Sequence, residues 1–246
     1  MIDAYFHPVN QNLPPPDLHQ TVWRLMRFER FVQLVDRRAL WFARFDEMED
    51  KEECRVPAKN LKPSVEALIS AGVPVHLAHA ANMSKLAGEA FFKRIEKEKR
   101  FNLINCWYIG DEPSNEMWAA YGSLPGSVAI RSRGTDVGES LSRPDGQQCF
   151  ANPVRYIEHD QDKLPMEHFL GPFFAKRRQY AFEAELRYLL HLASVAPKGA
   201  YVPTDLGRLI NEVRVNVNHS FDAEPVKELL RDVGLAIEVI EAHPVT

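Results

Sequence analysis

The stretch from Tyr180 to Leu190 constrains the fold of this chain more than any other segment. It reads YAFEAELRYLL, so Glu183, Glu185 and Arg187 alternate with apolar residues. A period of two residues predicts a β-strand with one polar, solvated face, because successive side chains point to opposite sides of a strand. Two carboxylates and a guanidinium are therefore expected side by side. They form either a ladder of ion pairs on a sheet or the floor of a polar site.

The rest of the chain supplies further strands and helices. Short apolar runs predict strands at 21–27, 39–43, 101–109, 127–131, 154–157, 201–203, 213–217 and 236–240. Helical spacing predicts helices at 29–38, 114–121 (with Ser114 as the N-cap), 206–210 and 225–233. Residues 134–148 are rich in Gly, Asp and Pro and predict a loop, and 173–179 predict a helical turn. Because helices and strands do not alternate strictly, the expected class is α+β, with a mixed, mostly antiparallel sheet.

Two segments fall outside this pattern. Residues 1–20 contain three consecutive prolines, which predict a stiff, extended lead-in. Residues 61–100 (about) predict a helical insertion, interrupted by a glycine and a proline. A single α+β domain is expected to span 21–246.

Composition narrows the class of protein. The net charge of −4 gives no bulk attraction to nucleic acid, and no apolar run is long enough to cross a bilayer. Cys54, Cys106 and Cys149 lie far apart without metal-binding spacing, as expected of reduced structural thiols. Neither a glycine-rich phosphate loop nor a nucleophile elbow occurs. We therefore expect a cytoplasmic protein with no membrane contact and no metal.

Candidate binding residues are basic and aromatic. Arg24 lies beside Trp23 on the first predicted strand, and its guanidinium would clamp a phosphate or carboxylate through two parallel hydrogen bonds. The alternative is a surface arginine whose stem covers Trp23. Trp118 and Tyr121 are three residues apart on one helix face. They would either stack a planar ring or pack in the core.

Two charged segments are further candidates. Lys176, Arg177 and Arg178 precede the strand predicted at 180–190. They would attract a phosphorylated ligand to the carboxylates of that strand. The acidic stretch 46–53 contains clustered carboxylates of the kind that hold Mg²⁺ or Ca²⁺. Its spacing fits no EF-hand, so a solvated acidic loop is favoured.

The order of these motifs is similar to that in one bacterial family. They are WRLMRF at 23–28, LWFAR at 40–44, DKEE at 50–53, NCW at 105–107, MWAAY at 117–121, VRY at 154–156, KR at 176–177 and FEAELR at 182–187. The combination resembles the bacterial domain-of-unknown-function family 2971 over about Thr21 to Val217. The resemblance implies a fold without an established activity. Some relatives look like parts of phage-defence or toxin-type loci.

A second similarity concerns mechanism. ADP-ribosyltransferases carry an Arg or His on a first strand, then a helix and a second strand, and a Glu-x-Glu or a lone Glu on a late strand. Arg24, the helix at 29–38, the strand at 40–43 and Glu183-Ala-Glu185 are similar in order and type. The resemblance implies an NAD-dependent ADP-ribosyltransferase or NAD glycohydrolase, with Glu185 catalytic and Glu183 selecting the acceptor. It predicts that Arg24 and Glu185 converge on one cleft.

The same hypothesis assigns the remaining binding residues. Arg24 and Lys176 would hold the pyrophosphate, Tyr121 or Trp118 would stack the nicotinamide, and Arg187 would belong to the same polar group. The ligand is then a nucleotide, and the acceptor is a protein or a nucleic acid.

Two other functions compete with this hypothesis. The first is a non-enzymatic sensor or antitoxin-like module of a defence system, which would bind protein or nucleic acid through a basic face at 93–100 or 176–178. The second, least favoured, is a metal-dependent hydrolase or nuclease using Asp46, Asp50 and Glu183.

Overall fold

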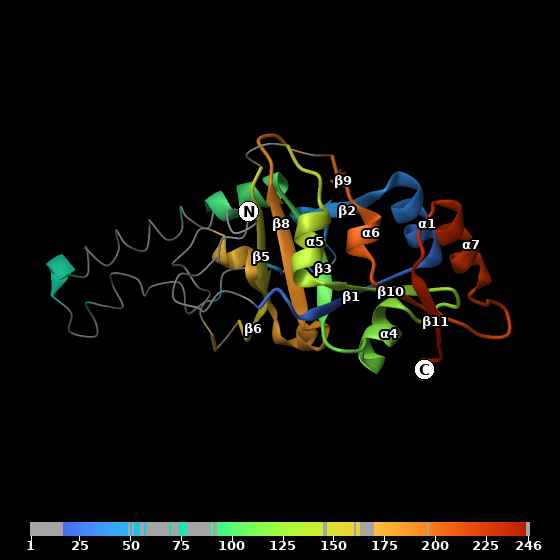
Figure 1. The fold of residues 1–246 in the computed structure, drawn as a ribbon. Coiled ribbons are helices and arrows are strands. Elements are labelled where there is room, and N and C mark those ends of the chain that lie inside the picture. The colour runs from blue at the N-terminus through green and yellow to red at the C-terminus, as the bar shows by residue number, and fades with distance from the viewer. Residues whose placement is uncertain are drawn as a thin grey trace.

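The computed structural model describes residues 17–48, 50, 52–54, 57, 69, 74–77, 90, 93–144, 147–159, 161–162, 170–195 and 197–244. Within them a nine-stranded sheet forms the centre of the molecule (Figure 1). Its strands are β1 (Thr21–Met26), β2 (Ala39–Arg44), β3 (Asn102–Ile109), β4 (Val128–Arg133), β5 (Cys149–Pro153), β8 (Glu185–His191), β9 (Gly199–Pro203), β10 (Glu212–Asn216) and β11 (Glu238–Ala242). A separate two-stranded sheet joins β6 (Arg155–Ile157) to β7 (Ala175–Arg177).

Helices and 3₁₀ turns connect these strands. The α-helices are α1 (Phe28–Arg37), α4 (Asn115–Tyr121), α5 (Gly134–Ser140), α6 (Leu206–Leu209) and α7 (Glu224–Asp232). The 3₁₀ turns are η1 (Phe45–Glu47), η3 (Lys99–Phe101), η4 (Gly171–Phe174) and η5 (Arg178–Glu183). Among the described strands, β10 pairs with β11 and β6 with β7 in parallel, while the other ladders are antiparallel. The predicted α+β class with a mixed, mostly antiparallel sheet is confirmed.

Two helices illustrate how local sequence sets their bounds. In α1 the residues Phe31, Leu34 and Val35 are buried at helical spacing, and the helix ends where Arg38 turns left-handed with φ 48°. In α4 the side chain of Ser114 accepts a hydrogen bond from the backbone N–H of Met117 (3.2 Å), which confirms the predicted N-cap.

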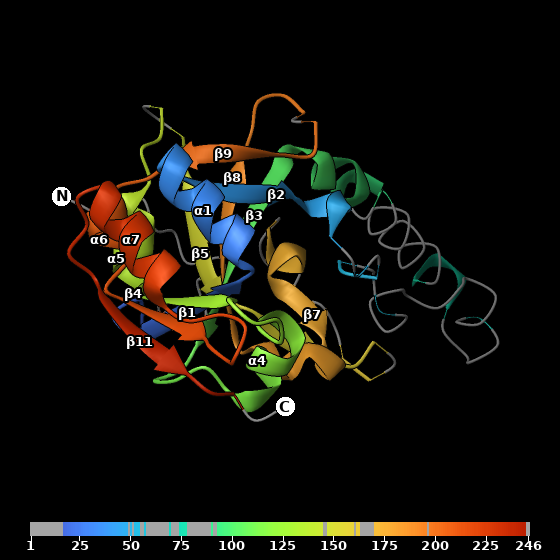
Figure 2. The ribbon, with the colours of Figure 1, turned by 90° about the vertical axis from the view of Figure 1, so that its right-hand side faces the viewer.

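Strand β8, which lies between β3 and β5, is buried on both faces. The face toward α1, α5, α6 and α7 packs the main hydrophobic core, and Figure 2 shows these helices gathered on one side of the sheet. Phe45, Phe173 and Leu189 belong to a second core on the opposite face, under η1 and η4. Strand β8 therefore lies inside the molecule, and its residues Glu185–Leu190 are all buried.

The sheet splits along one edge of β3. Strand β8 pairs with β3 along Asn102–Tyr108, so β1 and β2 must share the opposite edge. There β1 pairs only at its start, through Val22–Ile109 and Trp23–Tyr108, and β2 pairs at the other end, near Ile104. Strands β1 and β2 consequently diverge around the middle of β3. This divergence creates the space in which the candidate site lies.

The segment 180–190, predicted to be a strand with one solvated polar face, departs from that prediction. Residues 180–183 lie in η5, and Ala184 adopts a left-handed conformation with φ 35°, so the strand begins only at Glu185. The expectation of a solvated face is also wrong, because Arg187 is 0% exposed. Tertiary packing on both faces of β8 overrides the alternating pattern.

Three other local predictions are wrong. Residues 134–140 form α5 rather than a loop, since Val137 is buried in the main core and the N–H of Thr135 bonds to the carbonyl of Leu18 (2.7 Å). Residues 175–177 form β7 rather than a helical turn, because they pair with β6. The strand β5 lies where no strand was predicted, and it pairs with β8.

Two predicted segments lie mainly outside the described residues. The lead-in is described only at 17–20, and the insertion only at 69, 74–77, 90 and 93–100, of which 69, 75–77, 90 and 93–98 are α-helical. In the described part of the chain, no helix has the length and apolar character needed to cross a membrane.

Candidate functional site

A pocket with a cavity volume of about 210 Å³ lies where β1 and β2 diverge. Arg24, Trp41 and Cys106 line it from β1, β2 and β3. Tyr121 from α4 lines it together with three charged residues, which are Lys176, Glu183 and Glu185. The fold therefore brings together five of the seven residues that the NAD hypothesis assigns to catalysis and binding, all except Trp118 and Arg187.

Side chains from both strands complete the hydrogen bonding at the split. The guanidinium of Arg24 donates to the carbonyl of Cys106 (2.6 Å), which faces the gap. The side-chain amide of Asn105 donates to the carbonyl of Trp41 (2.9 Å). These two bonds replace the backbone ladder that the diverging strands cannot form, so the pocket stays open without orphaned carbonyls.

Glu183 is bound by two partners at the pocket wall. The hydroxyl of Tyr121 donates to one carboxylate oxygen of Glu183 (2.5 Å), and the ammonium of Lys176 bonds to the other. Burial raises the pKa of Glu183 above its ordinary value, although Lys176 and Tyr121 act in the opposite direction. A carboxylate with a raised pKa is the better proton acceptor of the pair.

Glu185 is held in its charged form. Its carboxylate receives the Nε–H of Arg187 (2.6 Å) and a second bond from Nη2 (3.1 Å), and the ammonium of Lys176 lies 3.5 Å away. Burial alone would raise the pKa of Glu185, but the charge and hydrogen bonds of Arg187, with Lys176, lower it to about 2. Glu185 is therefore ionised at neutral pH although it is 3% exposed.

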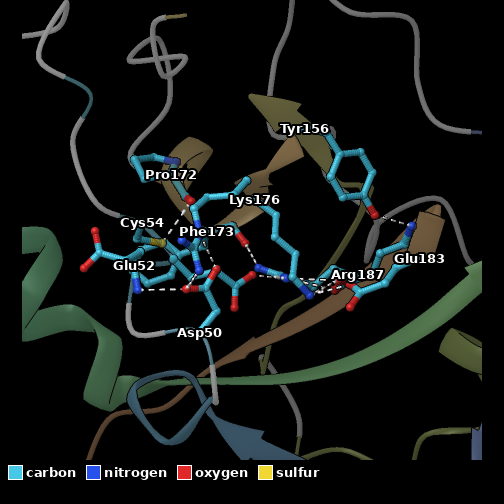
Figure 3. A network of polar contacts seen from close by, with 12 residues as sticks. Asp50, Glu52, Cys54, Tyr156, Pro172, Phe173, Lys176, Glu183 and Arg187 are labelled. Carbon is cyan, nitrogen blue, oxygen red and sulfur yellow. Dashed lines mark hydrogen bonds and ion pairs between the residues drawn. The ribbon is translucent and has the colours of Figure 1, made fainter. Parts of the chain in front are cut away.

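The ionic network extends well beyond the pocket. Arg187 also donates to Glu53 (2.6 Å) and to the carbonyl of Phe173 (2.6 Å). Figure 3 shows the network, with Asp50 and Cys54 at one end and Tyr156 and Glu183 at the other. Arg187 itself does not line the pocket. It supports Glu185 from behind.

A tight turn presents the two glutamates to the pocket. Ala184 takes the left-handed conformation between η5 and β8, which is uncommon for a residue with a Cβ. Its carbonyl accepts the N–H of Ile109 (2.8 Å), and the N–H of Glu185 donates to the hydroxyl of Tyr156 (2.9 Å). The turn changes the direction of the chain between the glutamates, yet both still reach the ammonium of Lys176.

Arg24 and Glu185 share this pocket, as predicted. Burial lowers the pKa of the Arg24 guanidinium, and the negative charge of Glu185 opposes that shift. Arg24 is half-buried, and its guanidinium bonds to the carbonyl of Cys106 in the pocket rather than lying at the surface. The guanidinium that lies over Trp23 is that of Arg214, 4.8 Å from the ring centroid.

Trp118 lies apart from the pocket. It is 5% exposed and packs with Trp23 and Ala129 in a small hydrophobic cluster. A Cβ on Gly122 would lie 2.4 Å from its ring, so the chain passes close over the indole. Core packing accounts for Trp118, and Tyr121 is the aromatic residue of α4 that faces the ligand space.

The cysteine in the pocket has an unreactive environment. Burial raises the pKa of Cys106 well above its ordinary value, and Glu185 adds to that shift. A neutral thiol is a poor nucleophile. Cys54 and Cys149 are likewise buried and free.

The acidic stretch is less solvated than expected. Glu53 is 2% exposed and bound to Arg187, and Asp50 forms a two-bond pair with Arg177 (2.7 and 3.1 Å). Among the described residues, no group of three His, Cys, Asp or Glu is arranged to hold a metal. The solvated-loop interpretation is wrong for Glu53, because the buried cation of Arg187 compensates its charge.

The basic segments are also partly paired. Arg178 contacts Glu158 and Asp162, and Lys176 and Arg177 are bound to carboxylates as well, so the described segment 176–178 presents no free basic face. In the segment 93–100, Lys99 is paired with Glu96, whereas Lys93, Lys97 and Arg100 are exposed. A basic face at 93–100 therefore stays a prediction.

Several pocket residues had no signal in the sequence. Trp41 and Cys106 lie on strands that were predicted, but only the split between β1 and β2 turns them toward a cavity. Tyr156 supports Glu185 across 29 residues of chain. Comparison with known proteins finds no matching family model and no matching curated protein, so the resemblances above stay predictions.

Proposed function

We propose that the pocket between β1 and β2 binds NAD and cleaves its nicotinamide–ribose bond, transferring ADP-ribose to an acceptor or to water. The observation that carries this proposal is the meeting of Arg24 and an ionised Glu185 in one pocket. A second carboxylate, Glu183, lies beside them with a raised pKa. One permanently charged and one titrating carboxylate suit a reaction that creates positive charge and then removes a proton.

Glu185 would stabilise the transition state. As the bond breaks, its electron pair moves to the nicotinamide ring nitrogen, and oxocarbenium-like positive charge develops on the ribose. A fixed carboxylate stabilises that charge and accepts a hydrogen bond from a ribose hydroxyl. Arg187 and Lys176 keep Glu185 ionised and hold its orientation.

Glu183 would complete the transfer. The acceptor or water adds to the ribose carbon and loses a proton, which Glu183 accepts. Lys176 and Tyr121 fix the position of this carboxylate. The products are nicotinamide, ADP-ribose on its acceptor, and one proton.

Tyr121 would provide the stacking surface. Its side chain is 45% exposed while its hydroxyl is tied to Glu183, so the ring is held at the pocket mouth. A planar ring stacked there would lie next to the carboxylates. Lys176 is a poor ligand for phosphate in this arrangement, because its ammonium already contacts two carboxylates.

The cellular setting extends the proposal. An enzyme that consumes NAD would act as a toxin or in phage defence, and its three free cysteines suit a reducing cytoplasm. We expect expression of the wild-type protein to deplete cellular NAD. Expression of a Glu185→Gln variant should leave the NAD pool unchanged.

The decisive experiment compares two buried glutamates. Glu185→Gln should reduce nicotinamide release by about 100-fold or more while NAD binding, measured by calorimetry, survives. Glu212→Gln is the matched control, because Glu212 is also buried on a strand and paired with arginines, but lies outside the pocket. Undiminished turnover in Glu185→Gln, or no nicotinamide release and no NAD binding by the wild-type protein, would overturn the proposal.

A further inference from the structure

A second groove continues the pocket toward α1. It has a cavity volume of about 520 Å³ and shares Arg24, Leu25, Trp41 and Tyr121 with the pocket. The groove and the pocket are therefore adjacent, and the carboxylates line only the pocket. Its other walls come from the start of α1 and from Tyr201 on β9.

The groove is strongly basic for a chain of net charge −4. Arg24, Arg27 and Arg30 line it, and no carboxylate does. Arg27 and Arg30 are both exposed. Arg30 donates to the neutral side-chain oxygen of Gln33 (3.1 Å), which leaves its charge uncompensated by that contact. Three guanidinium groups without a carboxylate among them favour an anionic ligand, above all a phosphate.

Aromatic rings form another wall of the groove, beginning with Trp41 beside the pocket. Trp41 and Tyr201 are paired across β2 and β9, with ring centroids 4.8 Å apart. The hydroxyl of Tyr201 bonds to Gln33 (3.1 Å), and the guanidinium of Arg37 lies 4.5 Å from the centre of its ring. The rings are therefore held in place before any ligand arrives. Fixed aromatic faces beside arginines match a planar base linked to phosphate.

The two hollows differ in charge. In the inner pocket Arg24 and Lys176 balance Glu183 and Glu185, whereas the outer groove is lined by three arginines and no carboxylate. A phosphate is therefore attracted to the groove more strongly than to the pocket. The cationic nicotinamide ring of NAD is attracted to carboxylates, and only the pocket supplies them. This difference favours one orientation of a dinucleotide, with its nicotinamide in the pocket.

We propose that the outer groove binds a nucleoside phosphate, with its base against Trp41 and Tyr201 and its phosphate on Arg27 and Arg30. Its role as the site for the adenylate half of NAD rests on the proposed function, whereas the binding of a nucleoside phosphate does not.

The test uses AMP and ADP-ribose, which lack the bond that the enzyme would cleave. Calorimetry should detect binding of both to the wild-type protein, with affinity falling as salt is raised. The double variant Arg27→Ala/Arg30→Ala should bind each at least tenfold more weakly. Arg231→Ala is the matched control, since Arg231 is an exposed arginine on α7 outside the groove.

The outcomes separate the two proposals. AMP binding that is absent, or that the double variant leaves unchanged, overturns the groove assignment even if NAD is cleaved. AMP binding that is lost in the double variant, in a protein that releases no nicotinamide, supports the groove and overturns only the proposed activity. A short single-stranded oligonucleotide that binds at this groove and is not displaced by excess ADP-ribose would also overturn the assignment.

Discussion

Replacing Arg187 by methionine tests whether the buried ionic network has the energetics inferred here. Arg187 is 0% exposed and compensates two buried carboxylates, Glu185 and Glu53. The pKa of Glu185 falls from 4.5 to about 2 in the folded protein. At about 1.4 kcal/mol per pKa unit this corresponds to roughly 3 kcal/mol of stabilisation at neutral pH. Loss of the bond to Glu53 adds to this cost, so Arg187→Met should destabilise the protein by about 3–5 kcal/mol.

The pH dependence gives a second, independent measure. A depressed folded-state pKa stabilises the protein above the unfolded-state value, near 4.5, and that stabilisation is lost as the pH falls toward 2. The wild-type protein should therefore lose stability through this window. The Arg187→Met variant should lose much less there, because the pKa of Glu185 is no longer depressed.

Urea unfolding followed by tryptophan fluorescence measures both effects. Arg131→Met is the matched control, because Arg131 pairs with Glu212 (3.1 Å) but is 43% exposed; it should cost less than about 1 kcal/mol. Adding Glu185→Gln to Arg187→Met should recover part of the loss, since it removes an uncompensated buried charge. A cost below about 1 kcal/mol for Arg187→Met, or a double variant less stable than the single one, would refute the reasoning.

Two further predictions concern the walls of the pocket and groove. Tyr121→Phe removes a hydrogen bond that favours ionised Glu183, so its pKa should rise and the acidic limb of nicotinamide release should move to higher pH; an unshifted pH–rate profile would contradict this. Gly199→Ala should destabilise the protein by about 1–3 kcal/mol and weaken AMP binding, because its Cβ would lie 2.3 Å from the carbonyl of Phe42 and 2.6 Å from the indole of Trp41 at φ 156°. Gly207→Ala, whose Cβ would meet its nearest atom at 3.5 Å, is the control, and equal losses of AMP binding in both variants would count against the role of that indole.

The structural features that could be predicted from the sequence are mainly those that depend on residues close together in the chain. The strands β1 and β2, the helix between them and the cap at Ser114 follow from local apolar spacing and turn chemistry. The convergence of Arg24 and Glu185 was expected from the resemblance, and both residues line one pocket. The strands, the helix and the cap need no knowledge of long-range pairing, whereas the meeting of Arg24 and Glu185 depends on it.

The features that were missed depend on contacts far along the chain. The left-handed turn at Ala184 removes Glu183 from the strand, and nothing in the residue type indicates it. The sequence around Glu53 indicates a solvated acid, because its partner Arg187 lies 134 residues further along the chain. Arg27 and Arg30 read as ordinary charges at a helix start, and only the divergence of β1 and β2 gives them a groove.

The pairing of β3 with β8 has a consequence for the order in which the protein matures. Asn102 pairs with His191 and Tyr108 with Glu185. This edge of β3 therefore stays unpaired until β8 has been synthesised, much later. Such non-local pairing slows folding and leaves a strand edge exposed meanwhile. Arg24 leaves the ribosome early and Glu185 late, so an unfinished chain holds one half of its site without the other. The candidate site is therefore complete only after β8 has paired with β3.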